Sequence, residues 1–248
     1  MTATVDIADA SITTTMHGAV AVLSWQRSAK RNAIDSAFAD QLASVLREVA
    51  ESSSAIVLWP QPQFCSGWDI GELQKIDPST PTGIDRVLTS GRSLLETIDT
   101  ISAYVVAVVD HVALGFGLAV LAACDYVVSA SDATFQLPEI ELGLVPSAVL
   151  ADLTTAIGQR NALRLALGTP ADAGTVRDMG LVDDIADEGS LAESVHALVG
   201  RLGAIPAPAL KSMRELSRRL DHATESERIA IGESFTRSQF LTNVGATR

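Results

Sequence analysis

The chain has 248 residues, of which 47% are hydrophobic and 19% charged, and its formal net charge is −12. A chain of this length can bury a sizeable core, and the composition is ordinary for a globular protein. The negative charge argues against broad binding to nucleic acids or membrane surfaces, which requires a basic face. No apolar run reaches the length of a membrane span and the N-terminus is no signal peptide, so we expect a cytoplasmic protein. Two cysteines far apart, Cys65 and Cys124, predict reduced thiols and no metal site.

The N-terminal part of the chain alternates strand and helix patterns. A β-branched run at 11–16, a turn at His17-Gly18 and an alternating run at 20–25 predict two strands. Asp35 is the expected cap of a helix. The apolar face of this helix recurs at helical spacing in Phe38, Leu42, Val45, Leu46 and Val49. The short apolar run 55–59 predicts a buried strand, and 84–98 predicts another helix.

The strongest strand signal, at 105–109, runs directly into the turn Gly115-Phe116-Gly117. Segment 118–124 predicts a buried helix and 126–129 another strand. Strands and helices that alternate through Gly-rich connections indicate an α/β fold. From about residue 152 the pattern is helical apart from 181–185, with helices expected within 191–219 and 225–240. We therefore divide the chain into a core, residues 1–190, and a C-terminal helical region, residues 191–248.

Two glycine-rich segments, 63–70 and 113–118, give the strongest functional signal. Glycine lets the backbone approach another group closely and tolerates φ > 0. Two such loops, each exposing a peptide N–H, can hold one carbonyl oxygen between them, as in an oxyanion hole. The pair predicts an enzyme that acts on an acyl carbonyl.

Further motifs surround these loops in a recognisable order and spacing. They are Lys30-Arg31-Asn32-Ala33-Ile34, Phe64-Cys65-Ser66-Gly67-Trp68-Asp69-Ile70, Ala113-Leu114-Gly115-Phe116-Gly117, Cys124-Asp125-Tyr126, the run from Phe135 through Leu137-Pro138-Glu139 to Pro146, Gly180-Leu181-Val182-Asp183, and Lys211. In this set the chain resembles the crotonase, or enoyl-CoA hydratase/isomerase, superfamily over about residues 11–215. The resemblance implies a crotonase-like spiral of ββα units with two sheets and a C-terminal helical oligomerisation region, which forms trimers or dimers of trimers. It also implies a coenzyme A thioester substrate, with no cofactor beyond that coenzyme A and no metal.

The resemblance assigns the oxyanion hole to the backbone N–H groups of Trp68 and Phe116, and a catalytic glutamate to Glu139. Hydratases of the family use a second glutamate, but its position is Ala119 here. Two carboxylates hold and activate water for addition, whereas one base suffices to move a proton between two carbons. The resemblance therefore favours double-bond isomerisation in an enoyl-CoA thioester. Hydration with Glu139 alone and non-catalytic acyl-CoA binding stay open, while Ser147 replaces the aspartate of dienoyl isomerases and aryl-CoA dehalogenases and disfavours both.

The residues expected around coenzyme A and the substrate lie in the same motifs. They are Lys30, Arg31, Ala33, Ser66, Gly67, Asp69, Ile70, Gly115, Gly117 and Pro138. Lys30 and Arg31 are candidates to meet the phosphates of coenzyme A, although a solvated surface charge explains either residue equally well.

Other residues keep two interpretations. The Trp68 indole is expected to form a wall of the acyl pocket or part of the core. Glu141 is the alternative base, and His111 is expected to be structural or exposed. The chain ends at Arg248, roughly where family members add another helix that helps to complete the coenzyme A site or the trimer contact.

Overall fold

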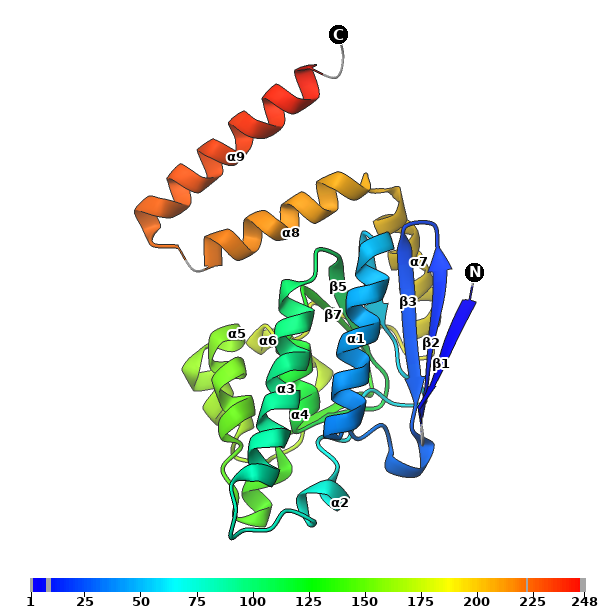
Figure 1. The fold of residues 1–248 in the computed structure, drawn as a ribbon, viewed down its shortest axis with the longest axis vertical. Coiled ribbons are helices and arrows are strands. Elements are labelled where there is room, and N and C mark those ends of the chain that lie inside the picture. Colours follow the sequence, from blue (N-terminus) through cyan, green and yellow to red (C-terminus); the bar gives the residue numbers. More distant parts are fainter. Residues whose placement is uncertain (1, 8–9, 222, 246–248) are drawn as a thin grey trace.

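The computed structural model describes residues 2–7, 10–221 and 223–245, and its centre is a seven-stranded sheet (Figure 1). The strand order is β1-β2-β3-β4-β5-β7-β10. The first three strands pair antiparallel and the remaining pairs are parallel. The strands are β1 (Thr2–Ile7), β2 (Ala10–His17), β3 (Val20–Gln26), β4 (Ala55–Leu58), β5 (Tyr104–Val109), β7 (Tyr126–Ala130) and β10 (Asp184–Ala186). A second sheet has the order β6-β8-β9, with β6 (Val112–Leu114), β8 (Thr134–Gln136) and β9 (Ala171–Asp172).

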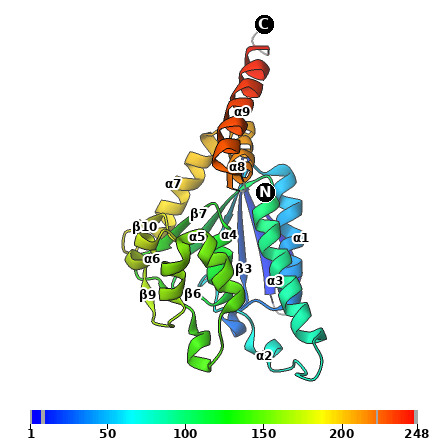
Figure 2. The same cartoon turned by 90° about the vertical axis from the view of Figure 1, so that its left-hand side faces the viewer.

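Helices cover both faces of the large sheet. Figure 2 shows α1 and α3 on one side of this sheet and α7 on the other. The helices are α1 (Ser36–Ser52), α2 (Ile70–Leu73), α3 (Thr82–Thr100), α4 (Phe116–Ala123), α5 (Ser147–Leu165), α6 (Ala173–Met179), α7 (Leu191–Ala204), α8 (Ala207–Asp221) and α9 (Glu225–Gly245). Short 3-10 helices span Ser28–Lys30 and Pro138–Leu142. The α/β class expected from the sequence is therefore confirmed.

Local sequence explains the elements that position the site. Asp35 caps α1 by accepting a hydrogen bond from the Phe38 N–H at 2.9 Å, and the apolar stripe of α1 is buried as predicted. Strand β4 is buried along its whole length, and β5 is buried after its first residue. This continuous burial is typical of a parallel sheet covered on both faces.

Two boundaries differ from the sequence prediction. The strand expected at 181–185 begins only at Asp184, because the Leu181 N–H bonds to the Val176 carbonyl at 2.9 Å and closes the end of α6. The helical stretch expected over 191–219 is two helices, since Pro206 stands between α7 and α8 and cannot donate a backbone hydrogen bond. The short strands β6, β8 and β9 have no counterpart in the sequence prediction.

The C-terminal helices lie at one end of the molecule, with α8 across the core and α9 running back above it (Figure 1). Arg214 of α8 is buried and anchors this helix by donating to the carbonyls of Ile98 (2.5 Å) and Ile101 and by pairing with Asp125. Helix α7 packs into the core, whereas α9 leaves Phe240 exposed. The domain boundary near residue 190 stays a prediction. Within the described part of the chain, no helix is long and apolar enough to span a bilayer.

Candidate functional site

The two glycine-rich loops lie against each other at the start of α4. Cys65 and Ala113 form an isolated parallel bridge, and the Leu114 N–H donates to the Cys65 carbonyl at 2.9 Å. A Cβ at Gly67 would lie 3.3 Å from the Leu114 carbonyl oxygen, and one at Gly115 would lie 3.6 Å from the Gly67 Cα. Both glycines have positive φ, +98° and +50°. Close approach and backbone conformation together explain why both positions are glycine.

Trp68 and Phe116 directly follow these glycines and carry unused N–H groups. Neither backbone N–H donates a hydrogen bond to another described residue. The groups on either side of the Trp68 N–H are engaged, because the Gly67 carbonyl accepts from the Ile34 N–H at 2.9 Å and the Asp69 N–H donates to the Ile34 carbonyl at 2.7 Å. Phe116 is the first residue of α4, so its N–H lies at the positive end of the helix dipole. Two unused donors on adjoining loops are suited to an oxyanion.

Glu139 brings a carboxyl group to these loops. It lies on the 3-10 helix Pro138–Leu142, and its Oε1 is only 2.7 Å from where a Gly115 Cβ would stand. Its Oε2 is buried and has no hydrogen-bond partner among the described residues. Burial raises the pKa of Glu139 above its ordinary value of 4.5, opposed only by its own backbone N–H. A carboxyl with these properties is a candidate for proton transfer.

The other candidate acid–base positions lie in different surroundings. Glu141 is exposed and accepts a hydrogen bond from the Gln136 side chain at 3.2 Å. Ala119 is fully buried within α4 and contributes only a methyl group. The His111 side chain is more than half exposed, in a turn with φ +58°, as expected from its position before the second loop.

A cavity of about 400 Å³, which we call the central cavity, is lined by Trp68, Phe116 and Glu139 and by residues of α3 and α5. The Trp68 and Phe116 rings meet edge to face, with 5.0 Å between ring centroids, and both line it. The Trp68 Nε1–H donates to the Glu72 carboxylate at 2.7 Å, which fixes the indole. Gly91 lets α3 approach both rings, because a Cβ there would lie 3.2 Å from the indole. Trp68 is thus a wall of a largely apolar cavity that also holds Glu139.

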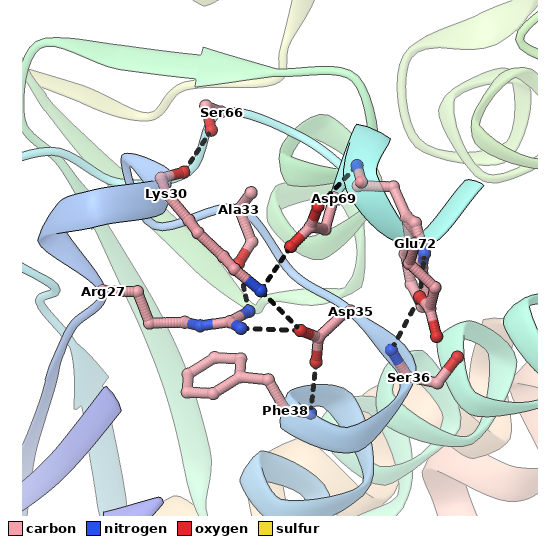
Figure 3. A network of polar contacts seen from close by, with 11 residues as sticks. Arg27, Lys30, Ala33, Asp35, Ser36, Phe38, Ser66, Asp69 and Glu72 are labelled. Carbon is pink, nitrogen blue, oxygen red and sulfur yellow. Dashed lines mark hydrogen bonds and ion pairs between the residues drawn. The ribbon is translucent and has the colours of Figure 1, made fainter. Parts of the chain in front are cut away.

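A polar network holds the first loop to the segment that follows β3 (Figure 3). The Lys30 ammonium pairs with Asp69 at 2.7 Å and with Asp35 at 3.3 Å. Arg27 is buried, pairs with Asp35 at 2.6 Å and donates to the Ala33 carbonyl at 2.6 Å. Burial is the largest single influence and favours the neutral form of both aspartates. The hydrogen bonds and charges of Arg27 and Lys30, together with backbone N–H bonds, outweigh it, so the pKa values of Asp35 and Asp69 fall below their usual range. The network positions the Trp68 backbone.

The residues predicted to bind coenzyme A and substrate fall into different settings. Lys30 holds the network just described, and the Ser66 hydroxyl donates to the Lys30 carbonyl at 3.2 Å. Arg31 and Ile70 are exposed. Gly117 packs on Cys65, where a Cβ would lie 3.0 Å from the cysteine Cβ. Ala33 belongs to the segment after β3, where its carbonyl accepts from Arg27. The remaining members lie at the loops themselves or beside Glu139: Gly67, Asp69, Gly115 and Pro138.

Two charged residues of the central cavity were missed by the sequence analysis. Arg92 of α3 and Asp152 of α5 both line it and form an ion pair with 3.3 Å between Nη1 and Oδ1. Burial raises the pKa of Asp152 despite the opposing charge of Arg92. A signal existed for Arg92, because it follows Ile84 and Leu88 at four-residue spacing on the cavity face of α3. Asp152 lay in a stretch that was recognised only as helical.

Comparison with known proteins shows the family of the chain. Residues 15–242 match the family model for enoyl-CoA hydratase/isomerase, and the chain belongs to this family of acyl-CoA enzymes. It is similar to the ethylmalonyl-CoA decarboxylase of Danio rerio, with 32% identity over 208 residues that cover 78% of this chain and 67% of the relative. It is also similar to the 2,3-dehydroadipyl-CoA hydratase of Escherichia coli K12, with 26% identity over 234 residues that cover 92% and 88%.

The fold agrees with this assignment. A protein from Thermobifida fusca YX, solved in complex with acetoacetyl-CoA, matches with a TM-score of 0.82 and 24% identity over 93% of this chain and 95% of that one. The crotonase-like fold expected from the sequence is thereby confirmed.

Proposed function

We propose that this protein shifts a double bond in an enoyl-CoA thioester by moving a proton with one glutamate. The observation that carries the proposal is the Glu139 carboxyl, buried and unpartnered at Oε2, beside two loops with unused N–H donors. No second carboxylate is present at Ala119, the position where family hydratases carry one. The family and the fold are shared with hydratases, so the preference for isomerisation rests on this one-base arrangement.

The mechanism uses the two loops and Glu139 together. The thioester oxygen accepts hydrogen bonds from the Trp68 and Phe116 N–H groups, which favour the negative charge that develops when a proton leaves carbon 2. Glu139 takes this proton, the double bond moves from carbons 3 and 4 to carbons 2 and 3, and Glu139 returns the proton to carbon 4. The raised pKa of Glu139 serves both steps, because the group must first accept and then donate a proton.

The ligand and the assembly follow as further proposals. Arg31, which is exposed near the first loop, is the better candidate for a coenzyme A phosphate, since Lys30 already pairs with two aspartates. We propose that no metal or additional cofactor takes part, and that activity therefore survives dialysis against a chelator. We also propose a homotrimer or dimer of trimers, supported by the exposed Ile229 and Phe240 on α9. Light scattering coupled to gel filtration measures this assembly directly.

The test is incubation with a 3-enoyl-CoA and, separately, with a 2-enoyl-CoA, followed by ultraviolet absorbance and mass. We expect conversion of the 3-enoyl to the conjugated 2-enoyl thioester without a change in mass to exceed addition of water. Fast hydration without isomerisation would establish the alternative hydratase with one glutamate. Ethylmalonyl-CoA is included because one relative is a decarboxylase of that compound. Tight binding with no turnover of any of the three would establish the non-catalytic binder.

A further inference from the structure

We propose that the Arg92–Asp152 ion pair is a recognition site for the far end of the acyl chain, and that it selects acyl groups that end in a hydroxyl. The inference rests on the proposed function, because it takes the central cavity as the acyl site. It adds a specificity-determining pair at a defined place in that cavity.

The pair lies at the junction of two cavities. Arg92, Leu95 and Asp152 line both the central cavity and a second cavity of about 700 Å³. The second cavity extends toward α8 and α9, as shown by its lining residues Arg218 and Arg228. On the other side of the junction, the central cavity is walled by apolar side chains of α3 and by the Trp68 and Phe116 rings. An acyl chain that fills the central cavity therefore ends at the ion pair.

The ion pair has unused hydrogen-bonding capacity. A guanidinium has five N–H donors and a carboxylate has two acceptor oxygens, but Arg92 and Asp152 are joined by a single contact of 3.3 Å. The Arg92 side chain is 51% exposed and that of Asp152 20% exposed. Burial favours the neutral form of Asp152 and outweighs the attraction of Arg92, which keeps the pKa of this carboxyl raised. Burial removes water from the Asp152 carboxylate, and a ligand that donates a hydrogen bond to this carboxylate would offset the loss.

The charges around the junction decide between the possible chain ends. A methyl end would displace water from both charged groups and offer no hydrogen bond in return. A carboxylate end would meet Arg92 but would be repelled by Asp152 and by the acids of the second cavity. These acids are Glu96, Asp99 and Asp221, with Asp125 already paired to Arg214, against the two further cations Arg218 and Arg228. A hydroxyl can donate to Asp152 and accept from Arg92 without adding charge, so it suits the pair best.

The test measures binding, so that it does not depend on turnover. Saturated straight-chain acyl-CoA thioesters from butyryl to decanoyl are titrated by calorimetry, each with a terminal methyl, hydroxyl or carboxyl group. At the chain length that reaches the pair, we expect the hydroxyl form to bind about tenfold or more tighter than the methyl form, the effect of one hydrogen bond to a charged group. The carboxyl form should bind more weakly than the hydroxyl form.

Variants give the inference a distinctive signature. Asp152→Asn keeps the size of the side chain but leaves the Arg92 charge unpaired, so the carboxyl form should become the preferred ligand. Replacing both members with apolar groups, as in Arg92→Met with Asp152→Leu, should make the methyl form the preferred ligand. Arg86→Met is the matched control, because Arg86 is an exposed residue of α3 outside both cavities. Its loss should leave the order of affinity for the methyl, hydroxyl and carboxyl forms unchanged.

Equal affinity for the three chain ends in the parent protein at every length would overturn the inference. An unchanged order in Asp152→Asn would overturn it as well. If the expected order is found but 3-enoyl-CoA is not isomerised, the proposed reaction fails while the recognition site stands. If no acyl-CoA binds at all, the acyl site itself is wrong, and both proposals are refuted.

Discussion

Replacement of Glu139 by Gln is the most direct perturbation of the candidate site. The amide keeps the size and shape of the side chain but removes the base. General acid–base groups contribute about 10²–10⁴-fold to rate, which corresponds to about 3–5 kcal/mol of transition-state stabilisation. We expect the rate of 3-enoyl-CoA isomerisation, followed by the absorbance of the conjugated product, to fall by this factor. The affinity for a saturated acyl-CoA, measured by calorimetry, should change little, because the two N–H donors remain.

The same substitution should leave the fold intact. Burial raises the pKa of Glu139, so ionisation costs more in the folded than in the unfolded chain. The folded state therefore binds more protons above the ordinary pKa of 4.5, and the stability of the parent falls as pH rises from there through the folded-state pKa. Gln carries no such penalty. We expect the free energy of unfolding of Glu139→Gln at neutral pH to equal or exceed that of the parent, so that lost activity cannot be ascribed to unfolding.

Glu141→Gln is the matched control, because Glu141 lies on the same 3-10 helix but is exposed and bonded to Gln136. It should retain parental activity. If Glu139→Gln turns over at a near-parental rate, the reasoning from burial and the unpartnered Oε2 is refuted. If Glu141→Gln alone loses activity, the base is Glu141.

Three further outcomes are expected. Gly115→Ala should abolish measurable isomerisation, because its Cβ would stand 2.7 Å from Glu139 Oε1. Gly143 is the control, since it also has a positive φ but a Cβ there would meet open space. Gly143→Ala should lower the free energy of unfolding by only about 1–2 kcal/mol. The isomerisation rate should rise with pH through a pKa above 4.5 as Glu139 ionises, and an inflection at or below 4.5 in a pH–rate profile would contradict the burial argument. Arg214→Met should cost about 3–5 kcal/mol in denaturant unfolding by leaving Asp125 unpaired, and adding Asp125→Asn should recover part of that loss.

The sequence was most informative where backbone geometry restricts the choice of residue. Gly67 and Gly115 stand out because only glycine suits a positive φ at a close backbone approach, and the structure brings their two loops together. The order of strands and helices was equally predictable, since burial of one face makes apolar residues recur with the period of the strand or the helix. Glu139 was found through its place in the Leu137-Pro138-Glu139 motif, and the structure puts its carboxyl beside the second loop.

Interactions between distant segments were not readable in this way. Lys30 was predicted as a candidate for coenzyme A phosphates, but its ammonium lies between Asp35 and Asp69, and the second of these is thirty-nine positions away in the chain. The short strands β6 and β8 were missed because β6 pairs with β8 across the intervening α4 and β7, and β8 pairs in turn with the distant β9. Such pairings depend on how complete elements pack, and local composition carries little trace of them.

The central cavity contains two carboxyl groups, and their surroundings separate their roles. Burial raises the pKa of both Glu139 and Asp152. Asp152 is paired with Arg92, so its charge is partly compensated, and a proton added there would weaken that pair. Glu139 has no ion-pair partner among the described residues, and it lies at the loops that carry the unused Trp68 and Phe116 donors. This difference supports the proposals that proton transfer belongs to the unpaired carboxyl at the loops and recognition to the paired one. One cavity can in this way hold two acids without the second becoming a competing base.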